Sequence, residues 1–282
     1  MAANNATPSE GPIRLNLKQI LSARSATRRI PAFIVRRLEK LICQDKLNEM
    51  LRVAYPRRGA EFCRAVLDHL NVKVEIEHAE RLPSPSERLL YVSNHPLGGL
   101  DGMALIDWVT ARHGVEPRFV VNDLLMAIEP LSDVFLPINK HGAQSRKSVV
   151  DIDAAMESDR PVIVFPAGLC SRRQGRSVAD LKWNKMFVRQ AIRWNRTVVP
   201  LRFCGENSGR FYRCASLREK VGIKFNIEMA LLPSEVFRAA GKTFKVICGN
   251  PVSPADLDGD PGSHAASLRQ YVIDLKSSDS QS

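Results

Sequence analysis

A histidine and an aspartate lie close together in a glycine-rich segment, residues 91–102, and have the residue types needed for acid–base chemistry. A neutral imidazole is the side chain best suited to take a proton near neutral pH, so we expect His95 to act as a general base. Asp101 is its expected partner, because a carboxylate fixes the imidazole tautomer and stabilises the imidazolium. Gly98 and Gly99 allow the tight backbone turn that would bring the carboxylate to the ring. A lone His near a lone Asp often has no role at all, which is the alternative.

A second segment, residues 164–176, combines an apolar strand end with a Pro-x-Gly turn and several cationic side chains. Ser171, Arg172 and Arg173 follow this turn. Guanidinium groups bind carboxylates and phosphates through paired hydrogen bonds, so the segment is suited to binding an anion. The alternative is a solvated charged turn, which the spacing supports equally. The spacing of a nucleotide-binding P-loop is missing.

Both segments follow short apolar runs, at residues 89–92 and 161–165, that predict buried strands. A helix is expected over residues 103–113, after a loop that contains Asp101. Further strands are predicted at residues 72–77, 118–121, 134–138, 197–203 and 243–249. Further helices are predicted at residues 145–157, 181–194, 211–230, 234–240 and 263–275. Alternating strands and helices indicate a three-layer α/β fold with a mostly parallel central sheet, whose carboxyl edge is the usual place for a ligand.

Composition limits the kinds of partner. The chain has 282 residues, of which 44% are hydrophobic, enough for a sizeable core. Its 41 Lys and Arg against 30 Asp and Glu give a net charge of +11, which favours anionic partners such as nucleic acid, lipid headgroups or an acidic carrier. Aromatic residues make up only 6%, and no nucleic-acid-binding motif is evident. We therefore expect no nucleic-acid partner.

The amino-terminal part, residues 13–71, is predicted to be basic and helical, between a disordered tip at residues 1–12 and the α/β domain at residues 72–276. A disordered tail is expected at residues 277–282. Apolar residues recur at helical spacing after Pro31, which suits a helix start: Ile30, Phe33, Ile34, Leu38, Leu41 and Ile42. Cations border this stripe: Arg28, Arg29, Arg36, Arg37 and Lys40. Such a helix can lie on an anionic bilayer. The alternative is that the stripe packs on the α/β domain.

The cellular location is predicted from three further features. The six cysteines are scattered without a Cys-x-x-Cys pair, which favours reduced thiols in the cytoplasm. Residues 1–11 resemble neither a signal nor a transit peptide, and no apolar run approaches the roughly 18 residues of a spanning helix. We expect a cytoplasmic protein, peripheral on the inner face of the cell membrane. The histidines lack metal-ligand spacing, so no metal site is expected.

Several motifs in a fixed order resemble the glycerolipid (lysophosphatidate-type) acyltransferase superfamily. These are Asn94-His95 followed by Asp101, the block from Phe165 to Gly168 with Ser171 and Arg172, and a Val-Val-Pro at residues 198–200. The family usually places four residues between His and Asp, whereas five stand here. Its usual Phe-Pro-Glu-Gly-Thr block is Phe-Pro-Ala-Gly-Leu. Both departures are similar to the aminolipid O-acyltransferase and hemolysin-like branch, and the whole chain resembles the Bacteroidetes-type members.

The resemblance implies an acyltransferase domain over residues 72–276 that esterifies a lyso-lipid hydroxyl from an acyl thioester, without a cofactor. The donor would be acyl carrier protein or coenzyme A, and the acceptor a lyso-aminolipid of the glycine or ornithine type. Substrate-binding candidates are Asn94, Gly98, Gly99, Lys140, Gly168, Ser171, Arg172 and Arg173. Among them, amides of Gly98, Gly99 or Gly168 are candidate oxyanion donors. Lysophosphatidate is the alternative acceptor, and a non-catalytic membrane-binding protein is the alternative from another class. A thioester on Cys170 is less favoured than a space-filling role.

Overall fold

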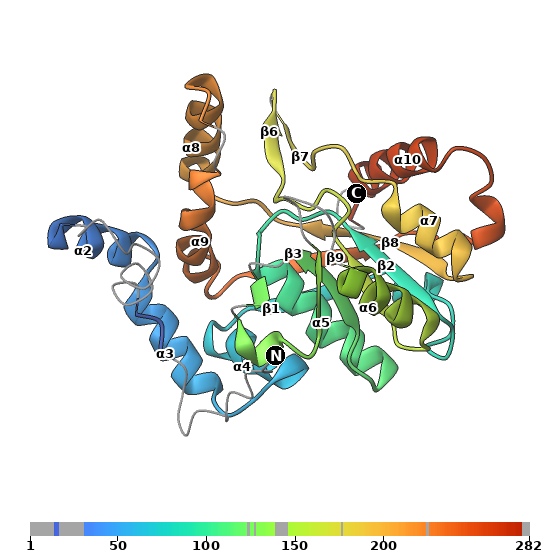
Figure 1. The fold of residues 1–282 in the computed structure, drawn as a ribbon, viewed down its shortest axis with the longest axis horizontal. Helices are drawn as coiled ribbons and strands as arrows, with labels where there is room; N and C mark the ends of the chain where they lie inside the picture. Colours follow the sequence, from blue (N-terminus) through green and yellow to red (C-terminus); the bar gives the residue numbers. More distant parts are fainter. Residues whose placement is uncertain are drawn as a thin grey trace.

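A central sheet with helices on both faces forms the body of the protein (Figure 1). The computed structural model describes residues 14–16, 31–122, 125–126, 128–138, 146–175, 177–223 and 226–277. The predicted disordered tip, nearly all of the predicted tail and Lys140 lie outside these residues. Within them, no helix has both the length and the apolar character needed to cross a bilayer.

The main sheet has seven strands in the order β1-β9-β8-β2-β5-β3-β4, and every neighbouring pair is parallel except β8 with β9. Its strands are β1 (Lys73–Glu77), β2 (Leu89–Ser93), β3 (Arg118–Asn122), β4 (Phe135–Ile138), β5 (Val162–Val164), β8 (Thr197–Cys204) and β9 (Thr243–Cys248). A separate antiparallel hairpin pairs β6 (Arg172–Gln174) with β7 (Ser177–Ala179). The predicted three-layer α/β class is therefore confirmed.

The described helices surround this sheet and extend beyond it. They are α2 (Ala32–Leu41), α3 (Gln44–Ala54), α4 (Gly59–His69), α5 (Leu100–His113), α6 (Arg146–Glu157), α7 (Met186–Arg193), α8 (Gly209–Lys220), α9 (Leu232–Arg238) and α10 (Pro261–Asp274). Short 3-10 turns are η1 (Ala79–Arg81), η3 (Glu129–Leu131), η4 (Ile227–Leu231) and η5 (Pro254–Asp256). Figure 1 shows α8 standing away from the sheet beside the β6–β7 hairpin.

Strand β2 is central in the sheet and buried along its whole length. Alternate side chains of a strand point to opposite faces, so Leu89 and Tyr91 pack with α3, α4 and α5, whereas Leu90 and Val92 pack with α6, α7 and α10. Burial on both faces explains why β2 reads as a continuous apolar run rather than an alternating one. A rigid central strand thus delivers the segment that contains His95.

The amino-terminal helices share the core of the sheet. Phe62 and Val66 of α4 pack in the same cluster as Leu105 of α5 and the strand residues Leu89 and Tyr91. The domain boundary predicted at residue 72 therefore does not coincide with a break between two cores.

Three expectations about local structure were wrong. The predicted loop over residues 166–176 contains the start of the β6–β7 hairpin, whose short polar strands lack an apolar signature. The helix expected over residues 181–194 begins only at Met186. The helix expected over residues 211–230 ends at Lys220, and a turn with Gly222 at φ +75° separates it from η4.

Candidate active site

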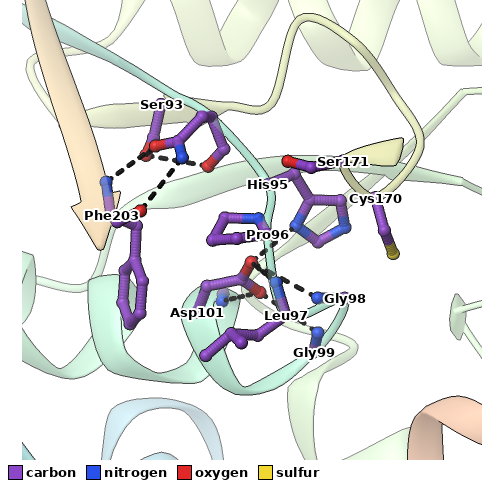
Figure 2. Close-up of polar contacts among 12 residues, drawn as sticks. Ser93, His95, Pro96, Leu97, Gly98, Gly99, Asp101, Cys170, Ser171 and Phe203 are labelled. Carbon is purple, nitrogen blue, oxygen red and sulfur yellow. Dashed lines mark hydrogen bonds and ion pairs between the residues drawn. The ribbon is translucent and has the colours of Figure 1, made fainter. Parts of the chain in front are cut away.

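The predicted histidine–aspartate pair is formed. His95 Nδ1 lies 3.0 Å from Asp101 Oδ2, as Figure 2 shows. The two side chains differ in exposure: that of His95 is 16% exposed, and that of Asp101 is fully buried. The sequence placed Asp101 in a loop, but α5 begins at Leu100 and includes it in the first turn. A carboxylate there is stabilised by the unpaired N–H groups of the helix terminus.

Asp101 is fixed by backbone donors from the segment it closes. Its carboxylate accepts hydrogen bonds from the amides of Leu97, Gly98, Gly99 and Gly102 (Figure 2). The turn requires glycine at residue 98, where φ is +77° and a Cβ atom would lie 2.5 Å from Cys170 Sγ. The prediction that Gly98 helps to return the carboxylate to the ring agrees with this geometry.

The imidazole ring is held on its other sides by the segment that follows β5. Phe165 stacks on His95 with ring centroids 4.1 Å apart and an angle of 22° between the planes. Cys170 also lies next to the imidazole (Figure 2). Because β5 pairs in parallel with β2, the two segments leave the sheet at the same edge. The ring is therefore hydrogen-bonded to Asp101 through Nδ1, interacts with the Cys170 side chain, and has restricted freedom to turn.

Burial and charge act in opposite directions on this pair. Burial lowers the pKa of His95, but the Asp101 carboxylate and Cys170 outweigh it, so the pKa lies above the ordinary value of 6.5. Burial likewise raises the pKa of Asp101, yet His95 and the backbone donors prevail and lower it below 3.8. The pair is thus stabilised in its charged form, and Asp101 remains an acceptor for the imidazole N–H.

A second buried carboxylate, Asp180, was missed by the sequence analysis. Its side chain accepts hydrogen bonds from the His95 amide at 3.1 Å, the Ser171 hydroxyl at 2.6 Å and the Trp183 indole N–H at 2.9 Å. Burial raises its pKa, although these donors act against the shift. The Ser171 amide also donates to the His95 carbonyl at 2.8 Å. Asp180 therefore joins the two segments, and no local spacing in the sequence marks it.

Two candidate substrate-binding side chains have structural contacts instead. The amide group of Asn94 donates to the Phe203 carbonyl at 3.0 Å and accepts from the Phe203 N–H at 2.7 Å, which anchors the end of β2 to β8. Ser171 is buried and donates to Asp180. In this conformation both side chains hold the active-site backbone in place.

Arg172 is also used within the protein, which corrects the expectation that it binds an anionic substrate. Its guanidinium is buried and pairs with the fully buried Glu228 at 2.7 Å. It also donates to the Cys170 carbonyl at 2.8 Å and lies over the Phe211 ring. Successive side chains of a strand point to opposite sides, so the next residue, Arg173, is exposed. Arg173 is thus the accessible arginine of the two.

The three backbone amides proposed as oxyanion donors already have acceptors. Those of Gly98 and Gly99 donate to Asp101, and that of Gly168 donates to the Phe165 carbonyl at 2.9 Å. None of the three is therefore free for a substrate oxygen in this conformation. Gly168 has a φ of +61°, so its turn needs glycine for a conformational reason.

Two cavities lie at the amino-terminal end and along the side of α8. One, of about 340 Å³, is lined by Leu97, Asn207, Glu235, Lys242 and neighbouring residues. The other, of about 330 Å³, lies between α8 and Arg173. His95 lines neither cavity. The candidate catalytic centre is therefore identified from the His95–Asp101 pair and not from a cavity.

This arrangement suits the transfer of an acyl group to a hydroxyl. A partly exposed imidazole, oriented through Nδ1 by a buried carboxylate, keeps Nε2 available to take a proton from an attacking hydroxyl. Two comparisons with known proteins agree. A family model described as acyltransferase matches residues 19–277. The lyso-glycine lipid O-acyltransferase of Phocaeicola vulgatus is 41% identical over 265 residues, covering 93% of this chain and 95% of that protein.

Two further proteins are similar to this chain. The lyso-glycine lipid O-acyltransferase of Bacteroides thetaiotaomicron is 40% identical over 247 residues, covering 87% of this chain and 89% of that protein. The crystal structure of the 1-acyl-sn-glycerophosphate acyltransferase PlsC from Thermotoga maritima is 14% identical with a TM-score of 0.48. The match covers 92% of this chain and 89% of that protein. The family model and the two sequence relatives each span most of the chain, so this protein belongs to the acyltransferase family and is an enzyme that transfers acyl groups.

Proposed function

We propose that this enzyme transfers a fatty acyl group from a thioester to the hydroxyl of a lyso-glycine lipid, in membrane lipid biosynthesis. The observation that supports this most is the His95–Asp101 pair, found in a chain about 40% identical to two lyso-glycine lipid O-acyltransferases over most of its length. Lyso-ornithine lipid is the related acceptor in the same class. The donor is acyl carrier protein or coenzyme A, and its thioester chemistry requires no cofactor.

In the proposed reaction, His95 Nε2 takes the proton of the acceptor hydroxyl as its oxygen attacks the thioester carbonyl carbon. Nδ1–H donates to Asp101, which stabilises the imidazolium that forms. The tetrahedral intermediate then collapses: the carbon–sulfur bond breaks, and the imidazolium returns its proton to the leaving thiolate. An ester and a free thiol result, so no acyl-enzyme is needed and nothing is oxidised or reduced.

The proposed site of action is the cytoplasmic surface of the membrane. On α2, Phe33 is 67% exposed and Ile34 is exposed too, while Arg36, Arg37 and Lys40 are exposed cations beside them. Ile30, Arg28 and Arg29, which were part of the predicted stripe, lie outside the described residues. The carboxyl end of α2 reaches the active-site side, since Leu41 packs against the cluster that contains Cys170. This face supports a peripheral contact with anionic lipid.

The test is mass spectrometry of the lipids formed by the purified full-length protein. Acyl carrier protein or coenzyme A thioesters would be offered with lyso-glycine lipid, lyso-ornithine lipid and lysophosphatidate together. We expect diacylated glycine lipid as the main product, with a rate about 10²- to 10⁴-fold lower in His95→Ala.

A matched control is His69→Ala, which removes an exposed histidine at the end of α4. This variant should retain the wild-type rate. Phosphatidate as the main product would keep the mechanism but overturn the acceptor. A His95→Ala variant as active as wild type would overturn the mechanism itself.

A further inference from the structure

A cationic groove is lined by one face of α8 and by Arg173 of the β6–β7 hairpin. Figure 1 shows these two elements as neighbours. The groove has a volume of about 330 Å³. We define the cationic groove by its lining residues: Arg173, Gly209, Tyr212, Arg213, Ser216, Leu217 and Lys220. The lining includes three cations and no carboxylate, so its charge favours an anionic ligand.

The cations of the groove have no carboxylate partner among the described ion pairs, because Glu228 pairs with other arginines. Glu228 is fully buried and pairs with Arg172 at 2.7 Å and with Arg218 at 2.9 Å. This ion-paired network connects β6 to α8 and η4 beneath the groove. In the described parts of the chain, no ion pair involves Arg173, Arg213 or Lys220, the three cations that face outward. The walls are thus fixed by paired charges, while the unpaired charges line the surface.

An apolar edge continues from the groove. Leu217, a lining residue, is 64% exposed, and Val221 one turn later is 65% exposed. Ile223 and Ile227 are exposed beyond them. A cationic groove that opens onto exposed aliphatic side chains suits an amphiphile with an anionic headgroup and a hydrocarbon chain. A pantetheine arm carries two amide groups and a hydroxyl, so it would gain less from this edge than a hydrocarbon chain.

The groove is connected to the catalytic histidine through buried side chains. Tyr212 lines the groove, is almost fully buried, and belongs to the same hydrophobic cluster as Cys170. Cys170 in turn lies next to the His95 imidazole (Figure 2). Arg173 is only two residues from Ser171, whose amide donates to the His95 carbonyl. The buried side chains of Tyr212 and Cys170 therefore join the wall of the groove to the segment that holds His95.

We infer that the cationic groove binds the carboxylate headgroup of the lyso-lipid acceptor, with the acyl chain leaving along the Leu217–Val221 edge towards the bilayer. This inference rests on the proposed function. It specifies where the acceptor headgroup binds and that its negative charge is recognised. Three cations around one carboxylate give charge-assisted hydrogen bonds, and guanidinium groups can form them in pairs.

The test compares acceptor kinetics of the full-length enzyme in mixed micelles, using lyso-glycine lipid and its methyl ester, which lacks the charge. For Arg213→Gln and Lys220→Gln, we expect KM for the free acid to rise about tenfold in each, with kcat and the donor KM little changed. The methyl ester should bind wild type about as weakly as the acid binds the variants, and the substitutions should not weaken it further. Arg210→Gln, an exposed cation on α8 outside the groove lining, is the control and should match wild type.

Three results would overturn the inference. An unchanged KM in both variants, or an equal rise for acid and ester, would mean that the groove does not recognise the carboxylate. Variants that lose binding to anionic vesicles but keep their KM for micellar acceptor would assign these cations to the bulk membrane. If wild type acylates no glycine lipid at all, the proposed function fails, and this result is distinct from a failure of the groove.

Discussion

The active-site segment and the cationic groove differ in how their polar groups are paired. Around His95, the Asp101 carboxylate accepts four backbone N–H groups and faces the imidazole, and Asp180 accepts three donors. In the groove, three cations are exposed without a described carboxylate partner. The polar groups of the first region are therefore paired with one another, whereas the cations of the second are exposed to solvent.

The contrast is sharpest between two consecutive arginines. Arg172 points inward to Glu228 and Phe211, whereas Arg173 points outward into the groove. Strand geometry alone separates their roles. A cationic motif in a sequence can therefore contain both a buried, ion-paired residue and an exposed one, and only the fold distinguishes them.

The largest expected effect comes from removing the charge that orients the base. Asp101→Asn should lower kcat by about 10²- to 10⁴-fold, and by no more than His95→Ala, because an amide neither fixes the imidazole tautomer nor stabilises the imidazolium. The acceptor KM should change little, since the cationic groove is unaltered. Steady-state kinetics with lyso-glycine lipid measures both. A kcat within tenfold of wild type, in a variant that folds normally by circular dichroism, would contradict the orienting role of Asp101.

The two arginines should differ in stability as clearly as they differ in position. Arg172→Ala leaves the buried Glu228 with Arg218 as its remaining cation, so the free energy of unfolding should fall by about 3 kcal/mol. Arg173→Ala removes an exposed side chain and should change it by less than about 0.5 kcal/mol. Urea denaturation of the two variants provides a matched pair. Equal losses would show that the inward and outward positions are not distinguished energetically.

The smallest expected effect is the pH dependence of the enzyme, which should depend on His95 and not on the cations of the groove. His95 must be deprotonated to act as a base, so kcat/KM should rise about tenfold per pH unit until its pKa, which is above 6.5, is passed. With the raised pKa of His95 and the lowered pKa of Asp101, the ion pair stabilises the fold fully between about pH 3.8 and 6.5, and this contribution is lost as the pH rises through the folded-state pKa of His95.

The test therefore measures both kcat/KM and the free energy of unfolding as functions of pH. Activity should increase over a pH range in which the unfolding free energy declines, and His95→Gln should remove this part of the decline. Arg213→Gln should leave the midpoint of kcat/KM unchanged, because its groove cation lies outside the pair. A midpoint below pH 6.5 in wild type would contradict the direction of the His95 shift.

The sequence predicted the parts of this protein that depend on local pattern. Apolar runs located the strands, and the glycine-rich segment identified His95 and Asp101. It failed where a contact joins residues far apart in the chain. Nothing near Arg172 indicates that Glu228 will neutralise it, and nothing near His95 indicates that Asp180 will accept its amide. The short β6–β7 hairpin was missed because its strands are polar and lack an apolar periodicity.

The residues that contact the active-site segment are translated at very different times. His95 and Asp101 are translated early, but Asp180, the Phe203 backbone that anchors Asn94, and Glu228 are translated much later. A nascent chain that has not passed residue 228 therefore has His95 and Asp101 but lacks the carboxylate that pairs with Arg172. The full set of contacts around the active-site segment can therefore form only after residue 228 has been translated.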